Sequence, residues 1–136
     1  MERFLGKYSP YLYALLRIIA GAMFAMHGTQ KLFNVPPGRG VVPIASLYGA
    51  AAIIEIVCGV LIAIGLLTSF AAFIASGEMA VAYFMNHVSK APWPIVEGGG
   101  ENAVLYCFLF LYMASRGSGP LSVDSIIRRP NSNAFR

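Results

Sequence analysis

Charged residues are scarce in this chain. Only 12% of its 136 residues are Asp, Glu, Lys or Arg, whereas 57% are hydrophobic. An ordinary soluble domain has about 25% charged residues, so the composition excludes that class. It also argues against a nucleic-acid-binding module, because the few basic residues are dispersed along the chain instead of clustered. We therefore predict an integral membrane protein in which residues 1–136 form one membrane domain.

Cysteine is also rare, and this limits the chemistry that the chain can carry. Cys58 and Cys107 form no C-x-x-C pair and no metal-ligand spacing. We interpret both as small packing residues; a redox pair remains open if the second and fourth predicted helices touch at matching depth. No metal site is predicted, because His27 and His87 belong to no tight ligand motif such as H-E-x-x-H.

The chain contains several long apolar stretches. A membrane-spanning helix needs about 20 mostly apolar residues, and the sequence predicts spans at residues 11–33, 44–67 and 70–88. A fourth, shorter span is predicted at 101–115, with the glycines before it at the level of the lipid headgroups. The predicted fold is therefore all-α, a transmembrane four-helix bundle followed by a cytoplasmic tail at 116–136.

Proline and glycine mark the predicted connections between these spans. The segments 34–43 and 89–100 are rich in both residues and cannot continue a helix. Thr68 and Ser69 are predicted to form a tight turn, which would make the second and third spans an antiparallel hairpin. Small residues spaced four apart predict close packing of helix backbones: Gly21 and Ala25, Gly59 and Ala63, Ala71 and Ala75, Ser76 and Ala80.

The distribution of basic residues predicts the orientation. With four spans, both termini lie on one side, which would carry six basic residues: Arg3, Lys7, Arg116, Arg128, Arg129 and Arg136. The other side would carry three: Lys31, Arg39 and Lys90. The positive-inside rule then places both termini in the cytoplasm of a multi-pass protein of the inner (plasma) membrane. The net charge of +4 is read as a topology signal and as attraction to anionic lipid headgroups.

One charged side chain lies near the middle of each of the first three spans: Arg17, Glu55 and Glu78. A charge at bilayer depth costs about 2.5–3.5 kcal/mol on insertion scales, so it is expected to face the bundle interior. Glu55 lies about 15 Å and Glu78 about 12 Å from the start of its span. We expect the glutamates to share a site with Arg17 as counter-ion. The three residues either fix helix register or handle protons and anchor a ligand.

A second polar cluster is predicted near the outer membrane face. His27, Gln30 and Lys31 have the spacing i, i+3, i+4 and so form one helical face. The ends of the third and fourth spans add His87, Glu101 and Asn102. Histidine exchanges protons near neutral pH, and these donors suit a quinone carbonyl. Plain hydrogen bonding at the interface is the open alternative for the histidines.

Five short motifs occur in order along the chain: HGTQKLF at 27–33, IEIVCG at 54–59 followed by Gly65 and Leu66, EMA at 78–80, GGENA at 99–103 and GPLSVD at 119–124. They resemble segments of the DoxX family of small four-helix membrane proteins. Its H-G-x-Q-K-L-F segment follows the first span, N/G-G-G-E-x-A begins the fourth, and G-P-G-x-x-S-L-D follows the bundle. The resemblance implies a four-helix bundle and supports the short fourth span.

The resemblance also implies a function. The DoxX family takes its name from a subunit associated with a terminal quinol oxidase and thiosulfate:quinone oxidoreductase, and other members are linked to membrane redox complexes and thiol stress. We therefore predict a subunit or accessory of a quinone-linked membrane redox system, with quinone as candidate cofactor and redox subunits or a second copy as partners. The alternative is a non-enzymatic bundle that binds a small lipophilic ligand or scaffolds a partner complex. Neither interpretation decides whether the chain is an enzyme.

Overall fold

The computed structural model describes residues 1–128, and all regular structure in that range is helical. Four long helices form the body: α2 (Ser9–Phe33), α3 (Leu47–Ile64), α4 (Thr68–Asn86) and α5 (Glu101–Arg116). The short elements are α1 (Glu2–Leu5), the 3-10 helix η1 (Gly6–Tyr8) and α6 (Val123–Ile127). The predicted all-α membrane fold is confirmed. Three segments, 2–33, 47–64 and 68–86, are long and apolar enough to cross a membrane.

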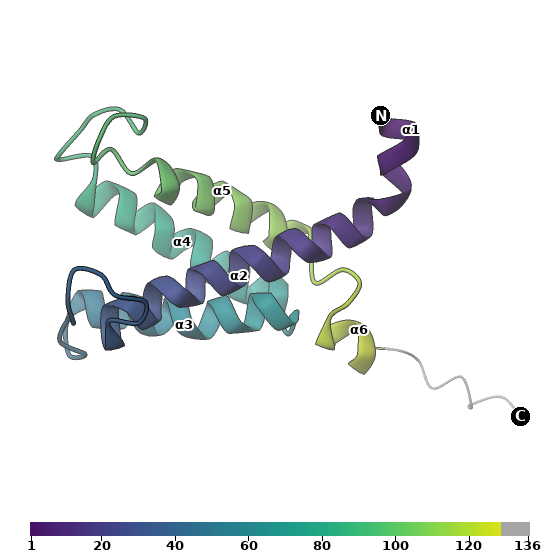
Figure 1. Cartoon of the computed structure of the whole chain (residues 1–136), viewed down its shortest axis with the longest axis horizontal. Helices are drawn as coiled ribbons and strands as arrows, with labels where there is room; N and C mark the ends of the chain where they lie inside the picture. The colour runs from purple at the N-terminus through teal and green to yellow at the C-terminus, as the bar shows by residue number, and fades with distance from the viewer. Residues whose placement is uncertain (129–136) are drawn as a thin grey trace, which may run out of the picture.

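Consecutive long helices run antiparallel to one another (Figure 1). The loops 34–46 and 87–100 lie at one end of the bundle, which we call the loop end. The N-terminal helix α1 and the C-terminal helix α6 lie at the opposite end, which we call the terminal end. Two of the basic residues that predict the orientation, Arg129 and Arg136, lie outside the described residues.

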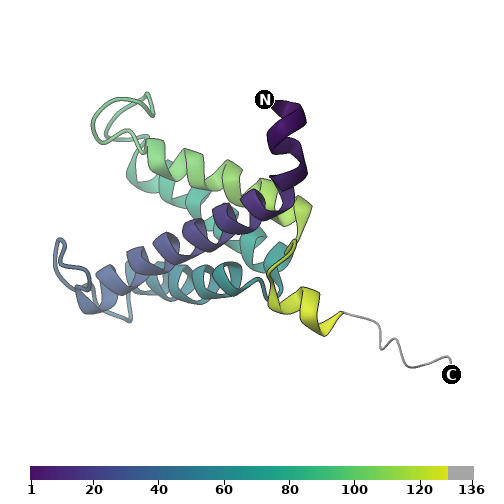
Figure 2. The ribbon, with the colours of Figure 1, turned by 45° about the vertical axis from the view of Figure 1, so that its right-hand side comes forward.

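The helices pack as two pairs. Helix α2 packs along α3, and α4 packs along α5, while α3 and α4 touch less extensively. The α3–α4 turn joins the pairs at the terminal end, and from there the pairs diverge toward the loop end (Figure 2). The two pairs therefore lie closer together at the terminal end than at the loop end (Figure 2).

Glycine allows the first pair to pack backbone to backbone. A Cβ atom added to Gly21 would lie 2.5 Å from the backbone nitrogen of Ala63. A Cβ added to Gly59 would lie 2.5 Å from the backbone nitrogen of Ala25. Only hydrogen fits at either position. Small residues of this kind let helix backbones approach closely in a membrane, where lipid removes the hydrophobic drive between helices. The predicted close packing is confirmed for these two pairs of small residues.

The packed core lies in the half of the bundle nearer the terminal end. Phe24 of α2, Ile62 of α3, and Phe110 and Met113 of α5 are all fully buried. The rings of Phe24 and Phe110 meet edge to face with centroids 4.8 Å apart. Alanines 72 and 75 of α4 are also fully buried and let the other helices approach.

The turn between α3 and α4 differs from the prediction. Thr68 and Ser69 were expected to form it, but α4 already begins at Thr68 and the turn occupies residues 65–67. Gly65 ends α3 in the left-handed conformation, with φ +74°, and its N–H donates to the carbonyl of Leu61. This is the usual glycine termination of a helix, so the glycine, and not the polar pair after it, sets the turn.

Arg17 is fully buried, but the predicted ion pair with the interior glutamates is wrong. Within residues 1–128 its Nη1 donates to the carbonyls of Ile62, at 2.7 Å, and Ala63, at 2.8 Å, and its Nη2 donates to that of Leu121, at 2.8 Å. Carbonyls in the last turn of a helix lack intrahelical partners, and the helix dipole favours a cation there. Arg17 therefore caps α3 and joins it to the segment before α6.

Part of the predicted tail folds back on the bundle. The backbone N–H of Asp124 donates to the carbonyl of Gly65 at 3.0 Å. Its buried carboxylate accepts hydrogen bonds from the Ser118 hydroxyl and from the backbone N–H groups of Leu67 and Thr68. These donors hold the pKa of Asp124 below its usual range, the Ser118 hydroxyl contributing most. Asp124 thus caps the start of α4, whose own N-cap residue, Leu67, offers no polar side chain.

We expect Asp124 to make the fold sensitive to acid. Because the folded-state pKa is depressed, the stabilisation is complete above the unfolded-state pKa of about 3.9 and is lost as pH falls through the folded-state pKa. Asp124→Asn should therefore lower the melting temperature at pH 7 and flatten its pH dependence below about pH 5. Thermal unfolding in detergent measures both effects. If the melting temperature fell equally steeply with pH in wild type and variant, Asp124 would not be the group that makes the fold sensitive to acid.

Candidate functional site

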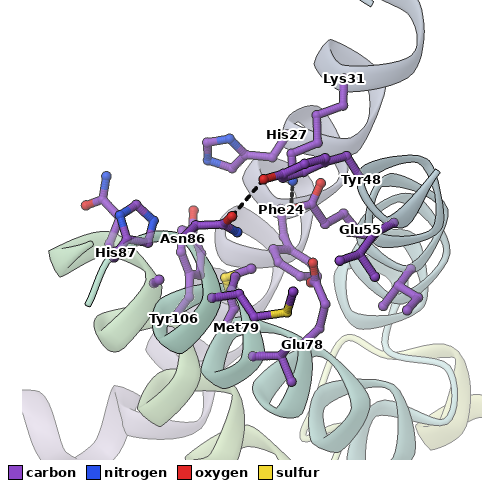
Figure 3. A pocket seen from close by; sticks show the side chains of 18 of the residues that line it. Phe24, His27, Lys31, Tyr48, Glu55, Glu78, Met79, Asn86, His87 and Tyr106 are labelled. Atoms are coloured by element: carbon purple, nitrogen blue, oxygen red, sulfur yellow. Dashed lines mark hydrogen bonds and ion pairs between the residues drawn. The ribbon is translucent and has the colours of Figure 1, made fainter. Parts of the chain in front are cut away.

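A cavity of about 700 Å³ lies between the two helix pairs, in the half nearer the loop end (Figure 3). All four long helices contribute to its lining, which is mainly apolar and aromatic: Phe24, Ile54, Ile74, Met79, Ala82 and Tyr106. A few polar side chains reach the same space. This combination, an apolar wall with a small number of converging polar groups, is typical of sites for small molecules.

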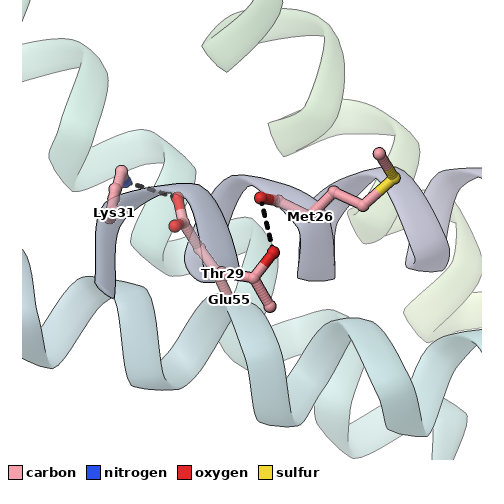
Figure 4. Close-up of polar contacts among 4 residues, drawn as sticks. All are labelled: Met26, Thr29, Lys31 and Glu55. Atoms are coloured by element: carbon pink, nitrogen blue, oxygen red, sulfur yellow. Dashed lines mark hydrogen bonds and ion pairs between the residues drawn. The ribbon is translucent and has the colours of Figure 1, made fainter. Parts of the chain in front are cut away.

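Glu55 is the most buried polar side chain of the cavity, and Lys31 is its counter-ion. The Lys31 Nζ donates to Glu55 Oε1 at 2.7 Å, and the exposed side-chain fractions are 33% for Lys31 and 3% for Glu55 (Figures 3 and 4). It is the only ion pair within residues 1–128. The second carboxylate oxygen of Glu55 is buried and has no hydrogen-bond partner among the described residues. Lys31 thus takes the role that was predicted for Arg17.

Glu78 faces the same cavity from α4. Figure 3 shows its carboxyl group directed into the space that Glu55 also faces. Its Oε2 is buried and has no hydrogen-bond partner within residues 1–128. Both glutamates lie about 12 Å from the loop-end termini of their helices, at about 1.5 Å of rise per residue. The two carboxyl groups therefore lie at one depth and face the same cavity as the Lys31 ammonium group.

Tyr48 and Asn86 connect the helix pairs on the loop-end side of the glutamates. The Tyr48 hydroxyl donates to Asn86 Oδ1 at 2.8 Å, from α3 to α4 (Figure 3). Neither residue was predicted from the sequence. A signal was present, because Tyr48 lies two helical turns before Glu55 and Asn86 lies about two turns after Glu78, so each shares a helix face with a glutamate.

Aromatic rings form one side of the cavity. Tyr106 of α5 packs against Phe24 with ring centroids 5.9 Å apart, and the rings of His27 and Tyr106 are nearly perpendicular with centroids 6.2 Å apart. Tyr106 also stacks on Phe110 at 5.4 Å, which continues the aromatic contacts into the buried core. Tyr106 is a further lining residue that was not predicted from the sequence.

The predicted outer residues divide into two groups. His27, Lys31, His87 and Asn102 line the cavity, whereas Gln30 and Glu101 line a neighbouring depression at the loop end. Gln30 and His87 also support the loops: Gln30 Nε2 donates to the carbonyl of Pro37 at 3.2 Å, and His87 Nδ1 lies 2.8 Å from that of Gly98. The structure therefore brings Glu55, Glu78 and most of the outer cluster into one site and leaves Arg17 outside it.

Neither cysteine lines the cavity or the neighbouring depression. Both Cys58 and Cys107 are free thiols. The Sγ of Cys107 lies 3.6 Å from the Ser76 hydroxyl, at the contact between α4 and α5. Within residues 1–128, no group of three or more His, Cys, Asp or Glu side chains is placed to hold a metal ion.

Comparison with known proteins identifies the family. The family model for DoxX matches residues 12–88, the part that contains α3 and α4 and nearly all of α2. A Haemophilus influenzae protein described as uncharacterized is 44% identical over 128 residues, covering 89% of this chain and 94% of that protein. No solved structure matches. On the family match and the apolar helices, the chain belongs to the DoxX family of multi-pass membrane proteins.

Proposed function

We propose that this protein is a subunit of a quinone-linked membrane redox system and that it holds the quinone head group in the cavity between the helix pairs. The observation that carries this proposal is the convergence of two carboxyl groups and one ammonium group on a largely apolar cavity. A quinone has a flat apolar ring with oxygen atoms at opposite edges. It therefore needs an apolar slot with hydrogen-bonding groups on two sides.

The dimensions and the wall of the cavity support a ligand of this class. A volume of about 700 Å³ lies within the usual range for small-molecule sites, roughly 300–1,000 Å³. The rings of Phe24 and Tyr106 offer flat surfaces for a quinone ring. The Lys31 ammonium group keeps N–H donors besides the one bonded to Glu55, and the Asn86 amide, whose Oδ1 is bonded to Tyr48, carries two N–H donors; these suit quinone oxygens.

The carboxyl groups suit the proton chemistry of a quinone. Reduction to the quinol consumes two electrons and two protons, and we assign the electrons to a redox partner protein of the same system. Glu55 and Glu78 are the two carboxyl groups that face the cavity, and a positioned carboxyl group can transfer protons to and from a bound quinone. Oxidation of a quinol would run the same steps in reverse, with the carboxylates accepting the protons.

Purification in mild detergent followed by mass spectrometry tests quinone binding. Wild-type protein should carry quinone or take it up when quinone is supplied. Ala82→Phe fills the cavity that Ala82 lines and should lower the bound quinone at least about tenfold, or 1.4 kcal/mol. Ala22→Phe is the matched control, because Ala22 is exposed on α2 and lines none of the cavities described here.

The outcomes of this experiment separate the candidate functions. Quinone that is retained equally by wild type, Ala82→Phe and Ala22→Phe would place binding outside the cavity. Failure of wild-type protein to bind any supplied quinone would reject the proposal. A different lipophilic molecule that is lost from Ala82→Phe would instead identify the protein as a binding bundle for that molecule.

The two glutamates should affect turnover more than binding. Glu78→Gln and Glu55→Gln keep the size of the side chain but remove its acid–base function. In membranes that contain the intact redox system, each should lower the quinone-dependent rate by about 10²-fold or more while quinone affinity changes only a few-fold. Glu97→Gln, at an exposed loop residue, is the control. Unchanged rates in both glutamine variants would remove the proton-handling role.

A further inference from the structure

The two ends of the cavity differ: buried apolar side chains close the terminal end, whereas polar side chains line the loop end. On the terminal side the cavity meets Phe24, and beyond it Ile62, Phe110 and Met113 are fully buried and in contact across the bundle. The Phe24–Phe110 ring contact of 4.8 Å closes the space between α2 and α5. A dry layer of this kind gives water molecules no polar partners.

Arg17 adds a fixed positive charge beyond this layer. It lies on α2 about 10 Å further toward the terminal end than Phe24, at about 1.5 Å of rise per residue. Three carbonyl oxygens hold its guanidinium group, and the side chain is fully buried. A buried arginine opposes the passage of protons and other cations, as fixed charges do in selective pores.

On the loop side, polar groups lead from the buried carboxylate to water. Lys31 bonds to the almost fully buried Glu55, yet its own side chain is 33% exposed. The charged and titratable groups that face this region from each surrounding element are His27 and Lys31 of α2, Tyr48 and Glu55 of α3, Glu78 of α4, Tyr106 of α5, and Arg39, His87 and Lys90 of the loops. The ion pair thus links the interior to the exposed end of the cavity.

We infer that the cavity exchanges water and protons with the loop side of the membrane only. The path from that side runs past Lys31 to Glu55 and Glu78, and the layer of Phe24 and Phe110 with Arg17 behind it closes the other side. With quinone in the cavity, each reduction takes two protons from the loop side while a redox partner protein supplies two electrons. This use of the path rests on the proposed function; the one-sided access does not.

Labelling with a membrane-impermeant, charged thiol reagent tests the access directly. The two native cysteines are first replaced by alanine, and Glu78→Cys and Ala82→Cys are then made separately in the full chain. A cysteine at exposed Glu97 reports the loop side, and one at exposed Arg128 reports the terminal side. The proteins are reconstituted into vesicles with known orientation, and reagent is added to one side at a time.

Both cavity cysteines should react from the side that labels Glu97→Cys, and at least about tenfold more slowly from the side that labels Arg128→Cys. The Ala82→Cys variant keeps the test valid if Glu78→Cys does not fold. Equal labelling from both sides, faster labelling from the terminal side, or no labelling from either side would overturn the inference. Since no quinone is needed, a failure to bind quinone would reject the proposed function and leave this result standing.

Discussion

Replacing Gly59 by alanine should lower the free energy of unfolding by about 1–3 kcal/mol, the usual cost of forcing an extra methyl group into a packed contact. The new Cβ would lie 2.5 Å from the backbone nitrogen of Ala25 and 2.7 Å from the backbone oxygen of Gly21. Backbone atoms of a helix cannot rotate away as a flexible side chain can, so α2 and α3 must separate. Unfolding in mixed micelles measures the loss.

Gly77 provides the matched control within the same bundle. It lies on α4, and an added Cβ there would meet no atom within 4 Å. Gly77→Ala should therefore be neutral or stabilise by up to about 1 kcal/mol, because alanine loses less conformational entropy in a helix. Gly21→Ala should behave like Gly59→Ala, and the two costs should not add, because both residues belong to one contact. Similar effects at Gly59 and Gly77 would contradict the close approach of α2 and α3.

Lys31→Met should destabilise the protein by about 2–3 kcal/mol, the lower part of the range for breaking a buried ion pair. The lower part applies because the Lys31 side chain is 33% exposed, while that of Glu55 is only 3% exposed. Methionine keeps the unbranched stem but removes the ammonium group. Glu55 is then left in the bundle interior without its counter-ion, and this accounts for most of the cost.

A double variant separates the ion pair from the packing of the stem. Adding Glu55→Gln to Lys31→Met removes the stranded charge and should restore more than half of the lost stability. Lys90→Met is the control, because Lys90 is exposed and belongs to no ion pair within residues 1–128; its effect should stay within about 0.5 kcal/mol. If the double variant lost as much stability as Lys31→Met and Glu55→Gln lose separately when added together, the Lys31–Glu55 pair would not be the stabilising contact.

The helices and the depth of the glutamates follow from the sequence because both depend on local patterns. Apolar length and the positions of glycine and proline define the helices, and a rise of about 1.5 Å per residue fixes how deep each residue lies. Since α3 and α4 form a hairpin, equal depth made a shared site for Glu55 and Glu78 predictable, and both line the cavity. Gly21 and Gly59 were likewise visible as small residues at helical spacing.

The partners of the charged residues could not be predicted in the same way. Depth along a helix does not specify which neighbour a long, flexible side chain reaches. Arg17 extends to the free carbonyls at the end of α3, and Lys31 extends inward to Glu55. The sequence also gave no sign that Asp124 would return to cap α4, because that contact joins residues far apart in the chain.

The fit of a quinone in the cavity between the helix pairs is the central claim, and photoaffinity labelling in membranes tests it most directly. A photoreactive quinone should label residues that line the cavity, such as Tyr48 on α3, Met85 on α4 and Tyr106 on α5. Excess unmodified quinone should suppress this labelling. Labelling confined to the exposed surface of α4 and α5, at residues such as Phe73 and Phe108, and unaffected by the competitor would contradict the account.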